Sequence, residues 1–153
     1  MLNILILKGL ASLLKQMSLR ILVAEDNKFT AQQYRQVLES NGYDVTIAYD
    51  GKECVEKYVS ALGKTEFESI SSHPFDLVLL DHNMPKKSGS KAAKEILSKN
   101  PKQRILFASG YLSSFIEDQT GEKITEKLDI IEKPFSLSAL LRKIKSIEKS
   151  KKN

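Results

Sequence analysis

Short apolar runs alternate with longer segments of helical spacing along most of the chain. Runs that are apolar throughout are typical of parallel strands that are covered on both faces. Their alternation with helices predicts right-handed crossovers and one parallel sheet with helices on both faces. We therefore expect an α/β protein with a doubly wound, five-stranded parallel sheet. The predicted strands are residues 20–24, 44–48, 77–80, 105–108 and 128–131.

Apolar side chains also recur at helical spacing between and after these strands. The second helical segment is followed by residues 63–74, which are polar and longer than a usual connection between a helix and a strand. They are interpreted as an extension of that helix or as a surface excursion. A fourth helix, with the poorest apolar spacing, is expected within residues 112–127. The other four helical patterns begin at Phe29, Cys54, Ala92 and Leu137.

The net charge of +5 is concentrated at one end of a chain whose 153 residues suit a single domain. Residues 131–153 contain seven Lys or Arg against two Asp or Glu, whereas residues 1–130 contain seventeen of each sign. A basic segment of this kind would suit nucleic acid, acidic lipid or an acidic partner surface. A solvated helix end is the simpler interpretation, and direct binding of nucleic acid is not expected.

The single cysteine, Cys54, excludes a disulfide framework within one chain and suits a reducing compartment, here taken to be the cytoplasm. Its position in a helical apolar pattern predicts a packing role. Two His residues without a Cys/His cluster argue against a structural zinc site. No apolar run reaches the roughly 20 residues that a membrane-spanning helix requires.

Residues 1–16 precede the first predicted strand and have several interpretations. As a helix, they would place five apolar residues on one face, namely Leu2, Ile6, Leu10, Leu13 and Leu14. Such a face suits a membrane-surface helix or a dimer-forming helix. A secretion signal fits less well, because no basic residue precedes the apolar run and the cleavage pattern is poor. A loosely packed extension, or a chain that starts at Met17, is also compatible with the sequence. These alternatives stay open.

Polar residues follow the predicted strands at the edge where ligands bind in an open α/β sheet. Glu25 and Asp26 follow the first strand, Asp81 the third, Ser109 the fourth and Lys133 the fifth. Three crowded carboxylates repel unless a cation lies among them, and Mg²⁺ prefers such oxygen ligands. A carboxylate can also attack phosphorus, with a lysine supplying charge and a hydroxyl a hydrogen bond to the phosphoryl oxygens.

Each of these residues also has a purely structural interpretation. Asp26 or Asn27 could cap the first helix, and Asp81 could be an ordinary loop acid. Ser109 could be a turn residue and Lys133 a surface charge. The prediction of a phosphoryl site therefore depends on the coincidence of all these residue types at one edge of the sheet.

Four stretches give this pattern a family resemblance: ILVAEDN (21–27), DLVLLDHNMP (76–85), ILFASG (105–110) and IIEKPF (130–135). The chain resembles a response-regulator receiver domain of two-component signalling, across residues 19–148. The resemblance implies a flavodoxin-like strand order of 2-1-3-4-5. Residues 1–18 would then be an N-terminal extension of uncertain structure, and residues 149–153 a basic tail.

The resemblance also implies a role for each candidate residue. Asp81 would be the phosphoacceptor, and Glu25, Asp26 and Asp81 would hold Mg²⁺ together with the backbone carbonyl of Asn83. Ser109 would be the switching hydroxyl that moves towards the phosphoryl group, and Lys133 would contact that group.

Further features of the resemblance concern the neighbouring positions. Gly110 would leave the site open to phosphodonors, and the Lys133–Pro134 bond would be cis. Ile130 departs from the family pattern, because an aromatic switch residue usually stands there. Tyr111 or Phe115 could provide an aromatic readout instead, although a core or surface role suits them as well.

The implied function is that of a stand-alone receiver, a phosphoacceptor switch that catalyses at most its own phosphorylation and dephosphorylation. A histidine kinase or phosphotransfer protein would supply the phosphoryl group, and a downstream protein target would read the switch. Dimerisation is left open.

Three other function classes fit the sequence less well. A binding module of the same fold that is not phosphorylated is disfavoured because every acidic position is present. An aspartyl phosphatase would need a general acid where Asn83 stands. A nucleotide site is excluded by the acidic stretch EDNKFT (25–30), which has no glycine-rich loop.

Overall fold

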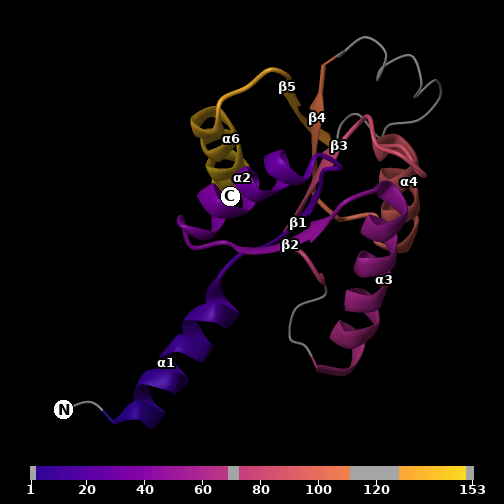
Figure 1. Ribbon diagram of the computed structural model, residues 1–153. Helices are drawn as coiled ribbons and strands as arrows, with labels where there is room; N and C mark the ends of the chain where they lie inside the picture. Colours follow the sequence, from indigo (N-terminus) through magenta and orange to yellow (C-terminus); the bar gives the residue numbers. More distant parts are fainter. Residues whose placement is uncertain (1–2, 69–72, 111–127, 151–153) are drawn as a thin grey trace.

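Five parallel strands form one sheet in the order β2-β1-β3-β4-β5 in the computed structural model (Figure 1), which describes residues 3–68, 73–110 and 128–150. This order and the parallel pairing confirm the predicted fold class. The strands are β1 (Arg20–Ala24), β2 (Asp44–Ala48), β3 (Leu77–Asp81), β4 (Ile105–Ser109) and β5 (Leu128–Glu132). Strands β3, β4 and β5 each extend one residue beyond the predicted run.

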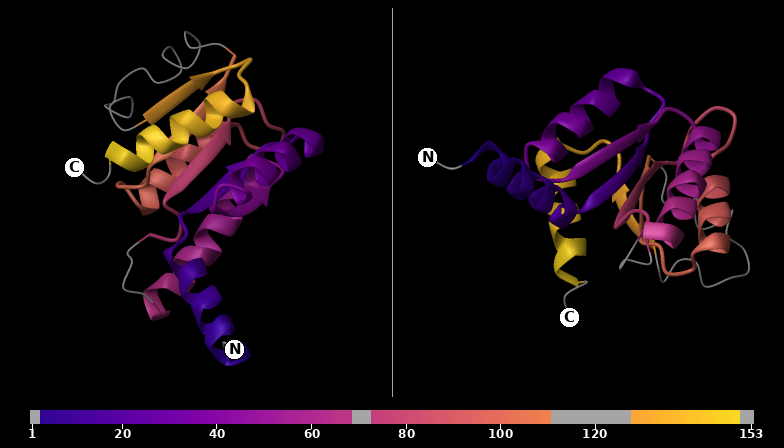
Figure 2. Two further views of the ribbon diagram at one scale, coloured as in Figure 1. Left: turned by 90° about the vertical axis from the view of Figure 1, so that its left-hand side faces the viewer. Right: turned by 90° about the horizontal axis from the view of Figure 1, so that it is seen from below.

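Helices cover both faces of the sheet, as the apolar strands require (Figure 2). The extended second helix was predicted correctly as one of two alternatives, since α3 continues to Glu68. The helix expected within residues 112–127 lies outside the described part of the chain. One face carries α2 (Lys28–Glu39) and α6 (Leu137–Ser150), and the other carries α3 (Gly51–Glu68) and α4 (Gly89–Lys99).

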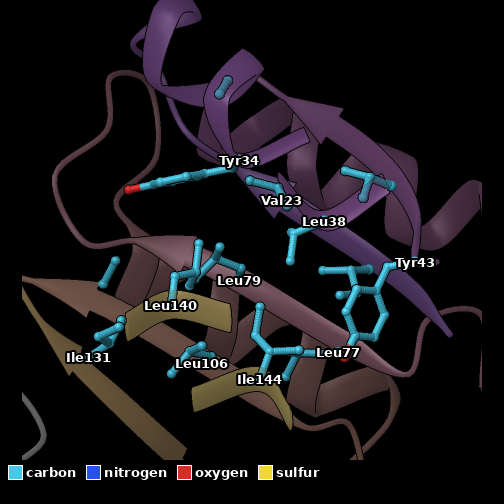
Figure 3. Close-up of a cluster of buried hydrophobic side chains, with 14 of the residues drawn as sticks. Val23, Tyr34, Leu38, Tyr43, Leu77, Leu79, Leu106, Ile131, Leu140 and Ile144 are labelled. Atoms are coloured by element: carbon cyan, nitrogen blue, oxygen red, sulfur yellow. The ribbon is translucent and has the colours of Figure 1, made fainter. Parts of the chain in front are cut away.

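Two hydrophobic clusters, one on each face, hold the layers together. Figure 3 shows the cluster in which Val23, Leu79 and Leu106 of the strands meet Leu38 of α2 and Leu140 of α6. The cluster on the other face includes Cys54, whose side chain is fully buried. Burial raises the pKa of the Cys54 thiol to about 12, and the predicted packing role is confirmed.

Side-chain caps fix where two helices begin relative to the strand ends. The side chain of Asn27 accepts a hydrogen bond of 3.0 Å from the backbone N–H of Thr30 at the start of α2. Ser88 accepts one of 3.3 Å from the N–H of Lys91 at the start of α4. Because Asn27 provides the cap, the carboxylate of Asp26 is not needed for it.

The segment before the first strand is helical from Ile4 to Met17 and forms α1. Figures 1 and 2 show α1 projecting away from the sheet and its covering helices. The helical interpretation of this segment is confirmed, while the secretion-signal and late-start alternatives are not tested by it. None of the described helices has the length and apolar character needed to cross a membrane.

Candidate functional site

The carboxyl ends of the central strands bring the predicted acidic residues together. Glu25 directly follows β1 and Asp81 ends β3, and these two strands are neighbours in the sheet. Both residues are buried, with 4% and 7% of their surfaces exposed, whereas Asp26 is exposed. One carboxylate oxygen from each of the three residues lies within 4.8 Å of the others.

Lys133 places its ammonium group against this acidic cluster. Its Nζ lies 3.2 Å from Asp81 Oδ1 and 3.9 Å from Glu25 Oε2. The backbone N–H of Lys133 donates a hydrogen bond of 2.8 Å to the carbonyl of Ser109, which ties the residue after β5 to the end of β4. The Lys133–Pro134 bond is cis, as the resemblance implied.

Ser109 and Asn83 complete the set at the same edge. Ser109 is the last residue of β4 and is buried, one position beyond the residue that pairs with Asp81. The backbone N–H of Asn83 donates a hydrogen bond of 3.3 Å to Asp81 Oδ1. All six predicted site residues therefore lie at one edge of the sheet, where parallel strands place their carboxyl ends.

The electrostatics of the cluster favour a bound cation. Burial is the main reason that the pKa of Glu25 is raised to about 8, and the hydrogen bond and charge of Asp81 act in the same direction. Lys133 opposes this shift but does not cancel it. Glu25 Oε2 is buried and has no hydrogen-bond partner among the described residues. A hard divalent ion would supply the missing partner, so the carboxylate donor set fits Mg²⁺.

The loop between β3 and α4 is held by contacts that the sequence analysis missed. Lys86 Nζ lies 3.2 Å from Asp50 Oδ2, and Lys86 has a positive φ of 65°. Asp50 also accepts a hydrogen bond of 2.8 Å from the N–H of Glu53 in the first turn of α3. This bond is the main reason, and Lys86 a further one, that the pKa of Asp50 is lowered.

Two glycines allow the backbone to pack closely around this loop. A Cβ atom on Gly51 would lie 2.0 Å from the carbonyl oxygen of Lys87, and one on Gly89 would lie 2.3 Å from that of Asp81. The Asp-Gly pair at 50–51 was the available sequence signal, since such pairs mark turns and close approaches. The glycines thus position the backbone that follows Asp81.

Replacing Gly89 by alanine is expected to displace the start of α4 from Asp81. The cost should be roughly 1–3 kcal/mol of unfolding free energy, because the obstructing atom belongs to the backbone. Urea unfolding would measure it. Gly63→Ala is the matched control in α3, where a Cβ would meet no described atom within 4 Å and a gain of about 0.5–1 kcal/mol is expected. Equal effects of the two substitutions would contradict the close packing at Gly89.

Ile130, which stands where an aromatic residue was expected, is half-buried and packs against the cluster on the α3 and α4 face. The two aromatic residues considered as alternatives, Tyr111 and Phe115, lie outside the described residues. Gly110 is exposed, and a Cβ atom there would meet none of the described residues within 4 Å.

Comparison with known proteins agrees with this geometry. The family model of the response regulator receiver domain matches residues 21–145. The chain is 33% identical over 132 residues to the chemotaxis protein CheY of Bacillus subtilis, and the alignment covers 84% of this chain and 96% of that protein. It is 30% identical over 131 residues to the transcriptional regulatory protein DltR of Streptococcus agalactiae, covering 83% of this chain. The chain spans about half the length of DltR, with 50% covered.

Solved structures with the same fold include other receiver proteins. A CheY-like receiver domain protein from Methanospirillum hungatei is 27% identical, with a TM-score of 0.66 over 88% of this chain and 98% of that one. The response regulator TrrA of Thermotoga maritima, solved in complex with Mg²⁺ and BeF, is 27% identical with a TM-score of 0.65, over 84% and 98% of the two chains. The chain therefore belongs to the response regulator receiver domain family.

Proposed function

We propose that Asp81 accepts a phosphoryl group and that the chain works as a phosphorylation-operated switch. The observation that carries this proposal is the placement of Lys133 Nζ 3.2 Å from Asp81 Oδ1, within a cluster of three carboxylates. A lysine and a divalent cation at one carboxylate are what a developing phosphoryl charge requires. The family membership supports the same function.

In the proposed reaction, a carboxylate oxygen of Asp81 attacks the phosphorus of a phosphohistidine on a histidine kinase or phosphotransfer protein. The new P–O bond forms as the P–N bond breaks, and the electron pair of that bond stays on the imidazole. The ammonium of Lys133 offers positive charge to the phosphoryl oxygens, and the hydroxyl of Ser109 donates a hydrogen bond to one of them.

Glu25, Asp26 and Asp81 would hold Mg²⁺, with the backbone carbonyl of Asn83 as a further ligand. The bound ion would neutralise negative charge shared between the carboxylates and the phosphoryl group. Glu25 would be ionised in that state, because the cation offsets the burial that otherwise favours its protonated form.

The output would follow from the positions of Ser109, the last residue of β4, and Lys133, which follows β5. Contacts of both residues with a phosphoryl group would favour one arrangement of these two strand ends. The surface beside β5 and α6 would then change its affinity for a downstream protein. We propose a receiver domain at residues 19–148, with residues 1–18 as an extension and residues 149–153 as a tail, and a cytoplasmic location.

Incubation with acetyl phosphate and Mg²⁺ tests the proposal. Intact mass spectrometry should show the gain of one phosphoryl group, and chelation of the metal with EDTA should prevent it. No gain in the presence of Mg²⁺ would refute phosphorylation and favour a binding module that does not carry a phosphoryl group. Catalytic turnover of a generic phosphoester would instead support the aspartyl phosphatase alternative.

A further inference from the structure

Helix α1 exposes an unusually large apolar surface. Every large apolar side chain described in this helix is exposed, and none belongs to either hydrophobic cluster. Together they expose on the order of 900 Å², whereas the largest apolar patch of a typical monomer covers roughly 300–600 Å². The exposed residues are Ile4, Leu5, Ile6, Leu7, Leu10, Leu13, Leu14 and Met17.

The shape of this surface distinguishes between possible partners. At about 100° per residue, all of these residues except Leu5 fall within an arc of roughly 180°. A two-helix seam uses a narrower stripe, about two positions in seven. A stripe through Leu10 and Met17 takes in either Ile6 and Leu13 or Leu7 and Leu14, and it leaves the other pair in water. Contact through such a stripe of a 14-residue helix would also bury less than the roughly 800 Å² per partner of a standard interface. A half-cylinder of apolar surface instead suits a helix that lies in a lipid interface.

The charges of α1 suit an acidic surface. Residues 4–17 contain two lysines, Lys8 and Lys15, and no acidic residue. Acidic lipid headgroups attract such segments and add to the burial of apolar side chains. At 14 residues the helix is shorter than the roughly 20 residues of a membrane span, so it would lie on a bilayer and not cross it.

A second basic surface lies close to the base of α1. Arg142, Lys145 and Lys149 are exposed and repeat along one side of α6. Leu19, which follows α1, and Ile147 of α6 line the same small cavity of about 20 Å³. The basic end of α6 and the base of α1 are therefore neighbours at the amino edge of the sheet, opposite the edge that carries Asp81.

We propose that α1 and the basic end of α6 bind the surface of a membrane that contains acidic lipids. The apolar half of α1 enters the headgroup region, and the lysines of α1 and α6 contact the acidic headgroups. In this orientation the edge of the sheet with Asp81 faces away from the bilayer, where a protein partner can reach it.

Flotation of the full chain with vesicles tests this proposal. Vesicles of phosphatidylcholine and phosphatidylglycerol should bind the protein about tenfold more strongly than vesicles of phosphatidylcholine alone, since each basic residue near an acidic surface adds to binding. Leu10→Glu combined with Leu14→Glu should reduce binding about tenfold or more, because a carboxylate resists transfer out of water. Lys145→Gln with Lys149→Gln should weaken binding to the acidic vesicles several-fold and leave binding to phosphatidylcholine unchanged.

Ser12→Glu is the matched control, since it adds a carboxylate at an exposed polar position of the same helix and should reduce binding less than Leu10→Glu alone. Uptake of a phosphoryl group from acetyl phosphate should be unchanged in all these variants, which separates this inference from the proposed function. The proposal is overturned if the wild-type chain does not float with acidic vesicles. It is also overturned if light scattering shows a dimer that Leu10→Glu dissociates, because a second copy would then cover the helix.

Discussion

Asp81→Asn is expected to abolish uptake of a phosphoryl group from acetyl phosphate. The substitution keeps the size of the side chain and its contact with the N–H of Asn83 through the remaining oxygen. It removes the negative charge of the carboxylate that attacks phosphorus and that faces Lys133, whose Nζ lies 3.2 Å from the same Oδ1. Intact mass after incubation with Mg²⁺ should show complete loss of the phosphorylated species that the wild type forms.

Asp44→Asn provides the control for this experiment, because Asp44 begins β2 at the opposite edge of the sheet. It should be phosphorylated to the same extent as the wild type. Persistent phosphorylation of the Asp81→Asn variant would place the acceptor at another residue. Loss in both variants would point to a general effect on the fold.

Glu25→Gln is expected to stabilise the metal-free domain at alkaline pH. The pKa of Glu25 is raised from 4.5 to about 8 in the folded protein, mainly by burial. Between these two pKa values the folded state holds a proton that the unfolded state has released. The free energy of unfolding therefore falls as pH rises from 4.5 to about 8, and this loss is complete above pH 8. The variant has no carboxyl group to ionise, and above pH 8 it should exceed the wild type by a few kcal/mol.

Thermal unfolding in EDTA would measure this difference, at roughly 2–4 °C per kcal/mol for a chain of this size. The two proteins should converge near pH 4.5, where Glu25 is protonated in the folded state. Addition of Mg²⁺ should raise the melting temperature of the wild type more than that of the variant, since the ion binds the ionised carboxylate.

Glu56→Gln, at an exposed position of α3, is the control and should change stability by less than about 0.5 kcal/mol at every pH. Parallel pH profiles for the wild type and Glu25→Gln would contradict the buried, protonated Glu25.

The strands could be predicted to within one residue because their signal is local. A strand such as 77–80 is apolar at every position, and the polar residue that follows it marks the edge of the core. The same rule located Asp81, Ser109 and Lys133, since a parallel sheet brings the residues after its strands to one edge.

Other features depend on contacts that a linear sequence does not display. The pair between Lys86 and Asp50 joins two loops that approach each other only because α3 and α4 pack side by side on one face. The lack of room for a Cβ atom on Gly89 likewise depends on how closely the start of α4 approaches the carbonyl of Asp81 in β3. The raised pKa of Glu25 requires its burial and its distance from Asp81, which the residue order alone does not give.

The burial of Cys54 has a practical consequence for watching this switch at work. The chain's only thiol is shielded and, with its raised pKa, almost wholly protonated at neutral pH, so it should react slowly with maleimide dyes. A cysteine introduced at an exposed position such as Ser12 or Ser138 should then be labelled selectively in the otherwise native chain. A fluorophore at position 12 would report on lipid contact of α1, and one at position 138 on partner docking near α6. The native Cys54 would not have to be replaced for either experiment.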